Sequence, residues 1–356
     1  MTFELNSLHD LLPARFDDII DVRAPSEFAE DHLPGAINLP VLDDAERAEV
    51  GTIYVQESRF RARKIGAAHV AANTAHHLRG PLADRPGDWS PLVYCWRGGQ
   101  RSGAFATILR QIGWRVEVLS GGYRSYRRQV VDMLHNETLP LAPVLLDGNT
   151  GTGKTALLAR LAARGAQVID LEALAGHRGS VFGATPSGQP PQKLFETRLV
   201  HALLQVSPDR PVVIEAESNK IGALNIPKSL WAAMRAAPRI SIAAPVAARA
   251  EFLVRAYQDI VSDSTLLAAR LETLRPLQGH AVVDHWHELA AAGANVELAA
   301  ALMQAHYDPR YAKSQARNAG RVVKSLSLAD LSDQSLDYAA DEISALLEKP
   351  GQSFAA

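Results

Sequence analysis

Short apolar runs alternate with longer segments of helical period along the chain. The runs lie at residues 19–22, 92–94 and 116–119 in the first part, and at 144–147, 167–170, 211–214 and 239–242 in the second. Loops that contain Gly or Pro follow them, as is typical of strands. This alternation predicts an α/β protein built on mostly parallel sheets. From about residue 247 to 307 the runs become rich in Ala and Leu, which predicts helices.

A linker is predicted at residues 136–143, because the sequence NETLPLAP has two prolines and no amphipathic period. A chain of 356 residues is also longer than one hydrophobic core usually supports. We therefore predict an α/β domain at residues 1–138, a second α/β domain at 139–245, and a helical extension at 246–356 that packs on the second domain.

The composition is that of an ordinary soluble protein, with 47% hydrophobic and 21% charged residues. No stretch of about twenty apolar residues occurs, and the N-terminus MTFELNSLHDLL is acidic, unlike a secretory signal. We therefore expect a cytoplasmic protein without a membrane partner. The chain has one cysteine, so its thiol is either a buried small side chain or a reactive nucleophile.

The net charge of −2 hides a strong segregation of charge. Residues 1–57 carry thirteen acidic and three basic side chains, whereas residues 58–138 carry thirteen basic and five acidic ones. A later basic cluster, from Arg310 to Lys324, precedes an acidic tail. Such blocks are usually solvated faces and only sometimes bind polyanions, so they support a basic face around the cysteine without proving one.

The cysteine, Cys95, follows the run at 92–94 and opens the loop Cys-Trp-Arg-Gly-Gly-Gln-Arg-Ser. A strand, a glycine loop and a helix N-terminus direct several backbone N–H groups at one sulfur. With Arg97 and Arg101 nearby, this arrangement favours a thiolate and then a persulfide or perselenide. The spacing Cys-x5-Arg-Ser also fits a tyrosine-phosphatase loop. The loop alone therefore leaves chalcogen transfer and phosphoester hydrolysis open.

Three further motifs occur in the order found in rhodanese sulfurtransferases. They are Asp21-Val22-Arg23 with Glu27-Phe28, the run HLPGAINLP from His32 to Pro40, and the run LSGGY from Leu119 to Tyr123. On these motifs, residues 10–130 resemble that family. The resemblance implies a rhodanese-like parallel-sheet domain built around Cys95. It assigns scaffold hydrogen bonds to Asp21, Arg23, Glu27 and His32.

About fifty residues separate Pro40 from Leu92, more than a compact rhodanese domain needs. Aromatic and basic side chains are interleaved in this insertion, and its candidate RNA-binding residues are Arg59, Phe60, Arg61 and Arg63, with Tyr54 close by. Aromatic stacking combined with phosphate neutralisation is a common way to hold single-stranded RNA. An amphipathic helix packed on the core fits the spacing equally well.

A phosphate loop of the Walker A type follows the apolar run at 144–147 and precedes a helical pattern. Its candidate diphosphate-binding residues are Gly148, Thr150, Gly151, Thr152, Gly153, Lys154 and Thr155. In such a loop backbone N–H groups surround a diphosphate, the lysine neutralises its charge, and the threonine hydroxyl can bind Mg²⁺. We therefore predict a P-loop NTPase-like second domain, with Lys154 catalytic and Thr155 a candidate magnesium ligand.

Two segments after the phosphate loop carry further candidates. Glu215 and Glu217 follow the run at 211–214, where a carboxylate can act as a base or bind a metal through water, or simply end a strand. Arg178 lies in the loop His-Arg-Gly-Ser-Val-Phe-Gly and is a candidate RNA contact. Neither segment is typical of a plain ATPase, which argues against assuming that ATP is the ligand.

The Cys-x-x-Gly-Gly-x-Arg-Ser loop, the phosphate loop, His-Arg-Gly-Ser-x-Phe-Gly and Glu-Ala-Glu-Ser together resemble the bacterial tRNA 2-selenouridine synthases over nearly the whole chain. In that family wobble 2-thiouridine is S-geranylated with geranyl diphosphate, and selenium from selenophosphate then replaces the geranylthio group. The resemblance implies tRNA, held at its anticodon region, with geranyl diphosphate and selenophosphate as co-substrates. It further implies Mg²⁺ with the diphosphate, no tightly bound cofactor, and a selenophosphate synthetase as a partner.

Two other classes stay open. A tRNA sulfurtransferase or a phosphatase would use Cys95 without geranyl diphosphate. A nucleotide-gated RNA-binding module would bind a nucleotide and leave the mass of the tRNA unchanged.

Overall fold

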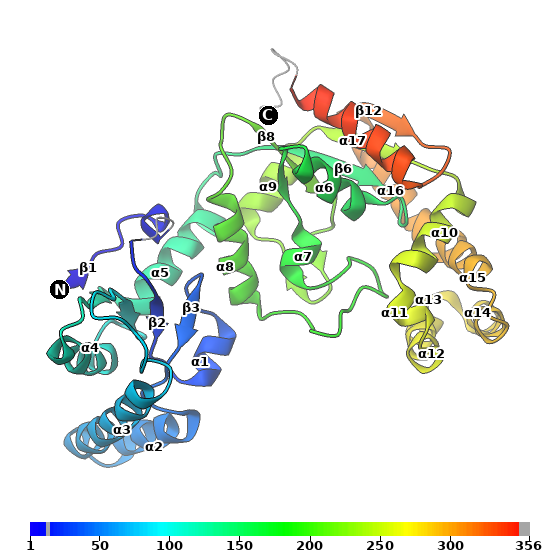
Figure 1. The fold of residues 1–356 in the computed structure, drawn as a ribbon. Helices are drawn as coiled ribbons and strands as arrows, with labels where there is room; N and C mark the ends of the chain where they lie inside the picture. The colour runs from blue at the N-terminus through cyan, green and yellow to red at the C-terminus, as the bar shows by residue number, and fades with distance from the viewer. Residues whose placement is uncertain (12–14, 349–356) are drawn as a thin grey trace. The chain divides into compact units, whose positions relative to one another are not determined.

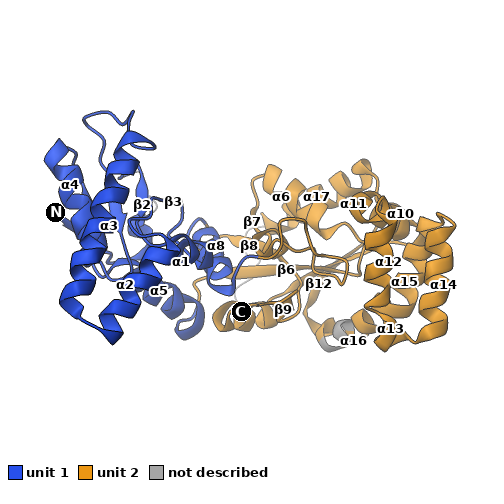
Figure 2. Cartoon of the chain, turned by 90° about the horizontal axis from the view of Figure 1, so that it is seen from below, with its two compact units in different colours: residues 1–138, 190–205 blue, residues 139–189, 206–356 orange. Residues whose placement is uncertain are grey.

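The computed structural model describes residues 1–11 and 15–348, without the side chains of Lys313, Ser314, Gln315 and Arg317. Two members of the predicted late basic cluster, Lys313 and Arg317, thus lie outside the described side chains. The chain forms two compact units. Figure 1 is coloured from the N-terminus to the C-terminus, and Figure 2 shows the two units in different colours. Unit 1 comprises residues 1–138 and 190–205, and unit 2 comprises residues 139–189 and 206–356.

Unit 1 is built on a five-stranded sheet in the order β1-β5-β4-β2-β3, in which every neighbouring pair is parallel. Its elements are β1 (Thr2–Phe3), η1 (Leu8–Leu11), β2 (Ile19–Asp21), α1 (Pro25–Glu30), β3 (Ala36–Asn38), α2 (Asp44–Gln56), α3 (Arg59–Arg79), β4 (Leu92–Tyr94), α4 (Gln100–Ile112), β5 (Glu117–Leu119), α5 (Gly122–Val131), η2 (Asp132–Asn136) and α8 (Gln192–Leu203). The apolar run of β4 is buried along its whole length, as a central strand covered on both faces requires. The predicted α/β class is confirmed for this unit.

The helix α8 belongs to unit 1, although β7 of unit 2 precedes it in the chain. Arg127 of α5 pairs with the buried Glu196 of α8, and the Tyr126 hydroxyl donates to Thr197 Oγ1 at 3.3 Å. The predicted second domain at 139–245 included this helix, and the structure corrects that boundary. The helical pattern of α8 in the sequence indicates that one face of the helix is buried, but it does not indicate which unit buries that face.

Unit 2 contains a second five-stranded parallel sheet, in the order β12-β11-β6-β8-β7, and a small antiparallel pair, β9 with β10. Its elements are β6 (Ala142–Gly148), α6 (Lys154–Ala163), β7 (Gln167–Ile169), α7 (Leu171–Ala175), β8 (Pro211–Glu215), β9 (Lys220–Ile221), β10 (Leu224–Asn225), α9 (Lys228–Ala236), β11 (Arg239–Ala243), α10 (Val246–Ala256), α11 (Gln258–Val261), α12 (Ser264–Glu272), α13 (Arg275–Gln278), α14 (His280–Ala291), α15 (Asn295–Leu302), η3 (Met303–Tyr307), α16 (Asp308–Asn318), η4 (Ala319–Arg321), β12 (Val322–Ser327) and α17 (Asp333–Leu347).

The predicted helical extension at 246–356 is wrong in one respect, because its last part completes the sheet. β12 pairs with β11 at the sheet edge, and α17 packs on α6. Leu326 of β12 joins the core made by Leu146 of β6 and Leu336 of α17. Leu326 is the one buried residue of β12, as is common for an edge strand, and this left no strong apolar run in the sequence.

The helices between α10 and η3 form a lobe with its own core. Leu267 and Leu271 of α12, Trp286 of α14 and Leu298 of α15 meet there, together with Phe182 from the loop after α7. These helices agree with the Ala- and Leu-rich pattern of the sequence. Among the described helices, none is long and apolar enough to cross a membrane.

Candidate active sites

The cysteine loop joins the end of β4 to the start of α4 in unit 1. Its backbone packs against the LSGGY turn before α5, since the N–H of Tyr123 donates to the carbonyl of Cys95 at 2.8 Å. The N–H of Arg124 likewise donates to the carbonyl of Trp96 at 3.0 Å. Gly122 has a φ of 59°, and a Cβ there would overlap the carbonyl oxygen of Cys95. The two rhodanese-like motifs therefore meet at the cysteine.

The Cys95 thiol is buried, with 3% of its surface exposed, and accepts a hydrogen bond from Ser102 Oγ at 3.1 Å. Burial by itself raises the pKa of the thiol. Hydrogen bonds from the Ser102 hydroxyl and backbone, the charge of Arg101 and the N–H of Arg97 outweigh burial and lower that pKa below its ordinary value. The site thus favours the thiolate, the form that attacks electrophiles or carries a second chalcogen.

The two predicted arginines of this loop have different surroundings. Arg101 pairs with Glu27 of α1, with 2.8 Å between Nη1 and Oε2, and Arg47 of α2 shares the same carboxylate. Burial raises the pKa of Glu27, but the two arginines outweigh it and lower that pKa. Arg97 is exposed and forms no ion pair with the described residues. Arg97 is therefore the arginine of this loop that is free to contact an anion.

A buried ion pair connects the end of β2 to the LSGGY turn, which packs against the cysteine loop. Arg23 binds Asp21 through contacts of 2.6 to 3.0 Å and also donates to the carbonyl of Asp31 at 2.6 Å. Its guanidinium carbon lies 4.1 Å from the ring centroid of Tyr123, whose hydroxyl donates to Asp31 Oδ2 at 2.6 Å. These contacts tie β2 to the LSGGY turn and agree with the scaffold role that the resemblance implies for Asp21 and Arg23.

The insertion folds as a hairpin of the helices α2 and α3. The buried residues of α3 are Ala62, Gly66, Val70, Thr74 and His77, which lie at helical spacing. The predicted tRNA-binding residues on this helix, Arg59, Phe60, Arg61 and Arg63, are exposed. Phe60 exposes 72% of its surface and Tyr54 exposes 49%. The insertion is thus a packed helix with a basic and aromatic outer face, so the two alternatives drawn from the sequence are compatible.

A cavity of about 290 Å³ lies between this hairpin and α4. Its polar lining comes from Tyr54 and Arg63 of the hairpin and from Gln100 and Arg101 at the start of α4. Because α4 begins directly after the cysteine loop, the cavity places the insertion beside that loop.

The phosphate loop lies between β6 and α6 in unit 2. The buried strand β6 ends at Gly148, and α6 begins at Lys154. Gly151, with a φ of 85°, packs against α10, since a Cβ there would lie 2.9 Å from Leu253 Cγ. The structure brings together all seven predicted residues of this loop, which are Gly148, Thr150, Gly151, Thr152, Gly153, Lys154 and Thr155.

A buried arginine outside the predicted motif holds the phosphate loop in place. Arg249 of α10 exposes 4% of its surface, donates to the carbonyl of Thr150 at 3.1 Å, and pairs with Asp308 at 2.9 and 2.7 Å. Asp308 also accepts a hydrogen bond from Asn149 Nδ2 at 2.8 Å. Burial raises the pKa of Asp308, but the bonds from Arg249 and Asn149 outweigh it and lower that pKa. No local sequence pattern indicates this pair, because its members lie 59 positions apart.

Two carboxylates approach the loop lysine. Lys154 Nζ donates to the carbonyl of Gly148 at 2.7 Å, and its charge acts on Glu172 of α7 and on Glu217 after β8. Burial raises the pKa of both carboxyl groups, and the charge of Glu172 raises that of Glu217 further. Glu217 was a predicted site residue. Glu172 was missed, since its place beside the loop depends on how α7 packs.

Glu215 has a different position from Glu217. It is buried in the sheet, and its Oε1 accepts a hydrogen bond from the backbone N–H of Glu172 at 2.7 Å. Burial raises its pKa well above the ordinary value. This bond anchors the start of α7, so Glu215 acts on the loop through Glu172.

Oxygen groups that suit Mg²⁺ lie at the start of α6. Thr155 Oγ1 donates to Glu172 Oε2 at 3.2 Å. Within residues 1–11 and 15–348, no group of three His, Cys, Asp or Glu side chains is arranged to hold a metal ion. A magnesium ion here would therefore need oxygen atoms from a bound phosphate in addition to the protein.

Arg178 is engaged within unit 2. Its guanidinium forms two hydrogen bonds to Asp259, at 3.0 and 2.6 Å, and lies 4.5 Å from the ring centroid of Tyr257. The next residue, Gly179, packs against the site carboxylates, since a Cβ there would lie 2.9 Å from Glu217 Oε1. The loop around Arg178 therefore belongs to the phosphate-loop site, and its role in tRNA binding stays a prediction.

Comparisons with known proteins match both units. Residues 4–129 match the family of rhodanese-like domains, and residues 141–269 match the tRNA 2-selenouridine synthase AAA domain. The chain is 35% identical over 346 residues to the tRNA 2-selenouridine synthase of Verminephrobacter eiseniae, across 89% of this chain and 92% of that protein. It is 38% identical over 259 residues to the tRNA 2-selenouridine synthase of Aeromonas salmonicida, across 71% of this chain and 68% of that protein. Among solved structures, a rhodanese-related protein from Thermoplasma volcanium aligns at 20% identity with a TM-score of 0.24, across 36% of this chain and 91% of that one.

Proposed function

The chain belongs to the tRNA 2-selenouridine synthase family, and from this premise we propose that it exchanges the sulfur of wobble 2-thiouridine in tRNA for selenium in two half-reactions. In the first, geranyl diphosphate alkylates the sulfur. In the second, selenium from selenophosphate displaces the geranylthio group. One observation carries the proposal: a single chain holds a cysteine loop that favours a thiolate and a phosphate loop, each complete within its own unit.

The phosphate loop is assigned to the first half-reaction. The thiocarbonyl sulfur forms a bond to C1 of the geranyl group while the bond from C1 to the diphosphate oxygen breaks, and the base loses its N3 proton. Lys154 and the backbone N–H groups of the loop offset the charge that develops on the departing diphosphate. Thr155 and Glu172 would hold Mg²⁺ against the diphosphate, where the ion adds positive charge.

The cysteine loop is assigned to the second half-reaction. Alkylation converts the sulfur into a better leaving group, so the selenium of selenophosphate can form a bond to C2 of the base while geranylthiol departs. Water then cleaves the selenium–phosphorus bond and releases phosphate, which leaves 2-selenouridine. A thiolate at Cys95, stabilised by Ser102, is the form of this side chain that can bind or transfer selenium. The exposed Arg97 is placed to bind the anionic selenium donor or a tRNA phosphate.

The hairpin insertion is assigned to the tRNA. Its exposed arginines would take phosphates, and the cavity it forms with α4 would receive an unstacked anticodon base beside the cysteine loop. Tyr54 and Arg63, which line that cavity, offer a stacking surface and a positive charge.

Two variants separate the half-reactions. Cys95→Ala should accumulate S-geranyl-2-thiouridine, because the phosphate loop is untouched. Lys154→Ala should fail to geranylate, with a deficit on the order of 3 kcal/mol in the barrier, yet should selenate tRNA that is already geranylated. Mass spectrometry of wobble nucleosides after incubation with each donor measures both outcomes.

Normal selenouridine formation by Cys95→Ala would remove this cysteine from the mechanism. Equal loss of both half-reactions in a folded Lys154→Ala protein would contradict the division of labour. The same experiment tests the other two classes. A sulfurtransferase would leave geranyl diphosphate unused, and a nucleotide-gated binding module would leave the tRNA mass unchanged.

A further inference from the structure

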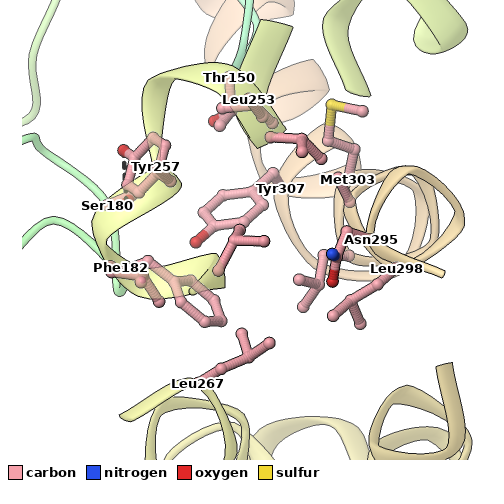
Figure 3. A pocket seen from close by; sticks show the side chains of 15 residues that line it. Thr150, Ser180, Phe182, Leu253, Tyr257, Leu267, Asn295, Leu298, Met303 and Tyr307 are labelled. Carbon is pink, nitrogen blue, oxygen red and sulfur yellow. Dashed lines mark hydrogen bonds between the residues drawn. The ribbon is translucent and has the colours of Figure 1, made fainter. Parts of the chain in front are cut away.

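An apolar cavity of about 70 Å³ lies in the helical lobe of unit 2, directly beside the phosphate loop. Its walls come from α10, α11, α12, α15 and η3, and from the loop that contains Ser180 and Phe182. Figure 3 shows Thr150 of the phosphate loop and Leu253 on one side of the cavity and Leu267 on the opposite side. The cavity thus extends from the phosphate loop into the lobe.

One side chain forms part of both the loop site and the cavity. Leu253 of α10 lines the cavity, and it also packs against Gly151, where a Cβ would lie 2.9 Å from Leu253 Cγ. One turn earlier on the same helix, Arg249 donates to the carbonyl of Thr150 at 3.1 Å. A ligand held by the loop therefore has the apolar wall of α10 within reach of its other end.

The lining selects a hydrocarbon over a nucleobase. None of the fifteen described residues that line the cavity carries a charge, and its apolar walls include Phe182, Leu298 and Met303. Two of its hydroxyl groups, those of Ser180 and Tyr257, lie 3.2 Å apart and bond to each other. A base buried here would lose its hydrogen bonds to water and find few replacements, chiefly Asn295 and the buried Tyr307 hydroxyl, whereas an alkyl chain would gain from burial against the apolar lining.

We propose that this cavity holds the hydrocarbon chain of a prenyl diphosphate whose diphosphate is bound by the phosphate loop. The inference rests on the proposed function and deepens it, since it makes the helical lobe the part of the protein that selects the alkyl donor. Each prenyl diphosphate should therefore bind more tightly than inorganic diphosphate, and a comparison of dimethylallyl, geranyl and farnesyl diphosphates measures how long a hydrocarbon chain the cavity accepts.

The test places a larger side chain on α15 so that it fills the cavity. Calorimetry then measures the binding of geranyl diphosphate and inorganic diphosphate to the full-length protein. Ala299 lines the cavity. Ala299→Phe should therefore weaken the binding of geranyl diphosphate by about tenfold or more, while the affinity for inorganic diphosphate changes by less than about twofold. Ala300→Phe makes the same change on the same helix at a position outside the lining and should bind like the parent protein. Should Ala299→Phe fail to bind inorganic diphosphate, the smaller Ala299→Leu provides the same comparison.

The outcomes separate this inference from the function on which it rests. If the parent protein prefers geranyl diphosphate over inorganic diphosphate and the Ala299 variants keep that preference, the hydrocarbon chain binds elsewhere. The inference is then overturned while the proposed function stands. If the parent protein binds geranyl diphosphate and inorganic diphosphate equally, the protein does not bind the hydrocarbon chain, and the inference is also overturned. If it binds neither, the proposed use of the phosphate loop fails, and the cavity inference fails with it. Loss of the preference in Ala299→Phe alone supports the inference.

Discussion

At the scale of single residues, the chemistry of unit 1 depends on a cysteine whose thiolate is favoured in spite of burial. The Ser102 hydroxyl, 3.1 Å from the sulfur, is the first of the groups that outweigh burial. A neutral donor in this position stabilises the anion without adding a charge that would itself need a partner. The pKa of Cys95 should therefore be sensitive to this one hydroxyl.

Ser102→Ala should raise the pKa of Cys95, because burial then acts with less opposition. Since the thiolate exists above the pKa, the variant should hold less thiolate at neutral pH and recover it as the pH rises. The ultraviolet absorbance of the thiolate, followed across a pH titration, measures this directly, because Cys95 is the one cysteine of the chain. The selenation rate should show the same displacement toward higher pH.

Ser102→Cys is unsuitable here because it adds a second thiol, whereas Ser102→Thr retains the hydroxyl and serves as the control. A parent-like titration in Ser102→Ala would show that the backbone N–H groups and Arg101 suffice to stabilise the thiolate.

At the scale of elements, the helix α3 combines a buried stripe with an exposed basic and aromatic face. The ion pair of Arg61 with Glu57 and the bond of Arg63 to its own helix are exposed, and such contacts contribute little to stability. The arginines can therefore exchange these partners for phosphates at small cost.

Replacing Arg59, Arg61 and Arg63 together by Gln should weaken tRNA binding and flatten the slope of log affinity against log salt by roughly two units. Each phosphate contact releases counterions and adds about 0.7 to 0.9 to that slope. Phe60→Ala should instead cost about 1–3 kcal/mol of binding free energy with little change in slope, since stacking releases no counterions. Filter binding over a salt series separates the two effects.

Arg79→Gln, at the other end of α3, is a matched control for this series. Unchanged affinity and slope in the triple variant would mean that α3 only packs on the core and that the tRNA binds elsewhere, with the region from Arg310 to Lys324 as the next surface to test.

Much of the fold and of both loops could be predicted because their signals are local. Apolar runs bounded by Gly and Pro marked the strands that became β2, β4, β6 and β8, and the spacing of Gly, Lys and Thr marked the phosphate loop. Each of these patterns fits within about ten consecutive residues, so chain connectivity alone brings their members together.

The parts that could not be predicted depend on contacts between distant segments. Glu172 reaches the phosphate loop through the placement of α7, and the pair of Arg249 with Asp308 joins α10 to α16. No local period or spacing encodes such contacts, because they form only when the core packs.

At the scale of the whole molecule, the two units are interleaved along the chain. The chain passes between them at 138–139, at 189–190 and again at 205–206, because α8 belongs to unit 1. A single break between Thr138 and Leu139 would leave α8 covalently part of the longer fragment while it still packs on α5.

A protease site introduced between Thr138 and Leu139 should therefore give two fragments that elute together in size-exclusion chromatography and separate only in denaturant. Glu196→Ala should promote their separation, because it removes the ion pair that joins α8 to Arg127; Arg127 keeps Asp31 at 3.7 Å, so the loss should stay below the roughly 3–5 kcal/mol of a fully unpaired buried charge. Immediate separation of the fragments from the unmodified sequence would show that α8 contributes little to unit 1.

The interleaving also governs the order in which the protein can fold as it leaves the ribosome. Unit 1 lacks α8 until residue 203 has emerged, long after its last strand, β5, is complete at residue 119. The sheet of unit 2 is completed later still, because its edge strand β12 ends at residue 327. Unit 1 is therefore complete only after residue 203 has emerged and the sheet of unit 2 only after residue 327, so apolar strands of each unit stay exposed for part of translation, when chaperones can protect them.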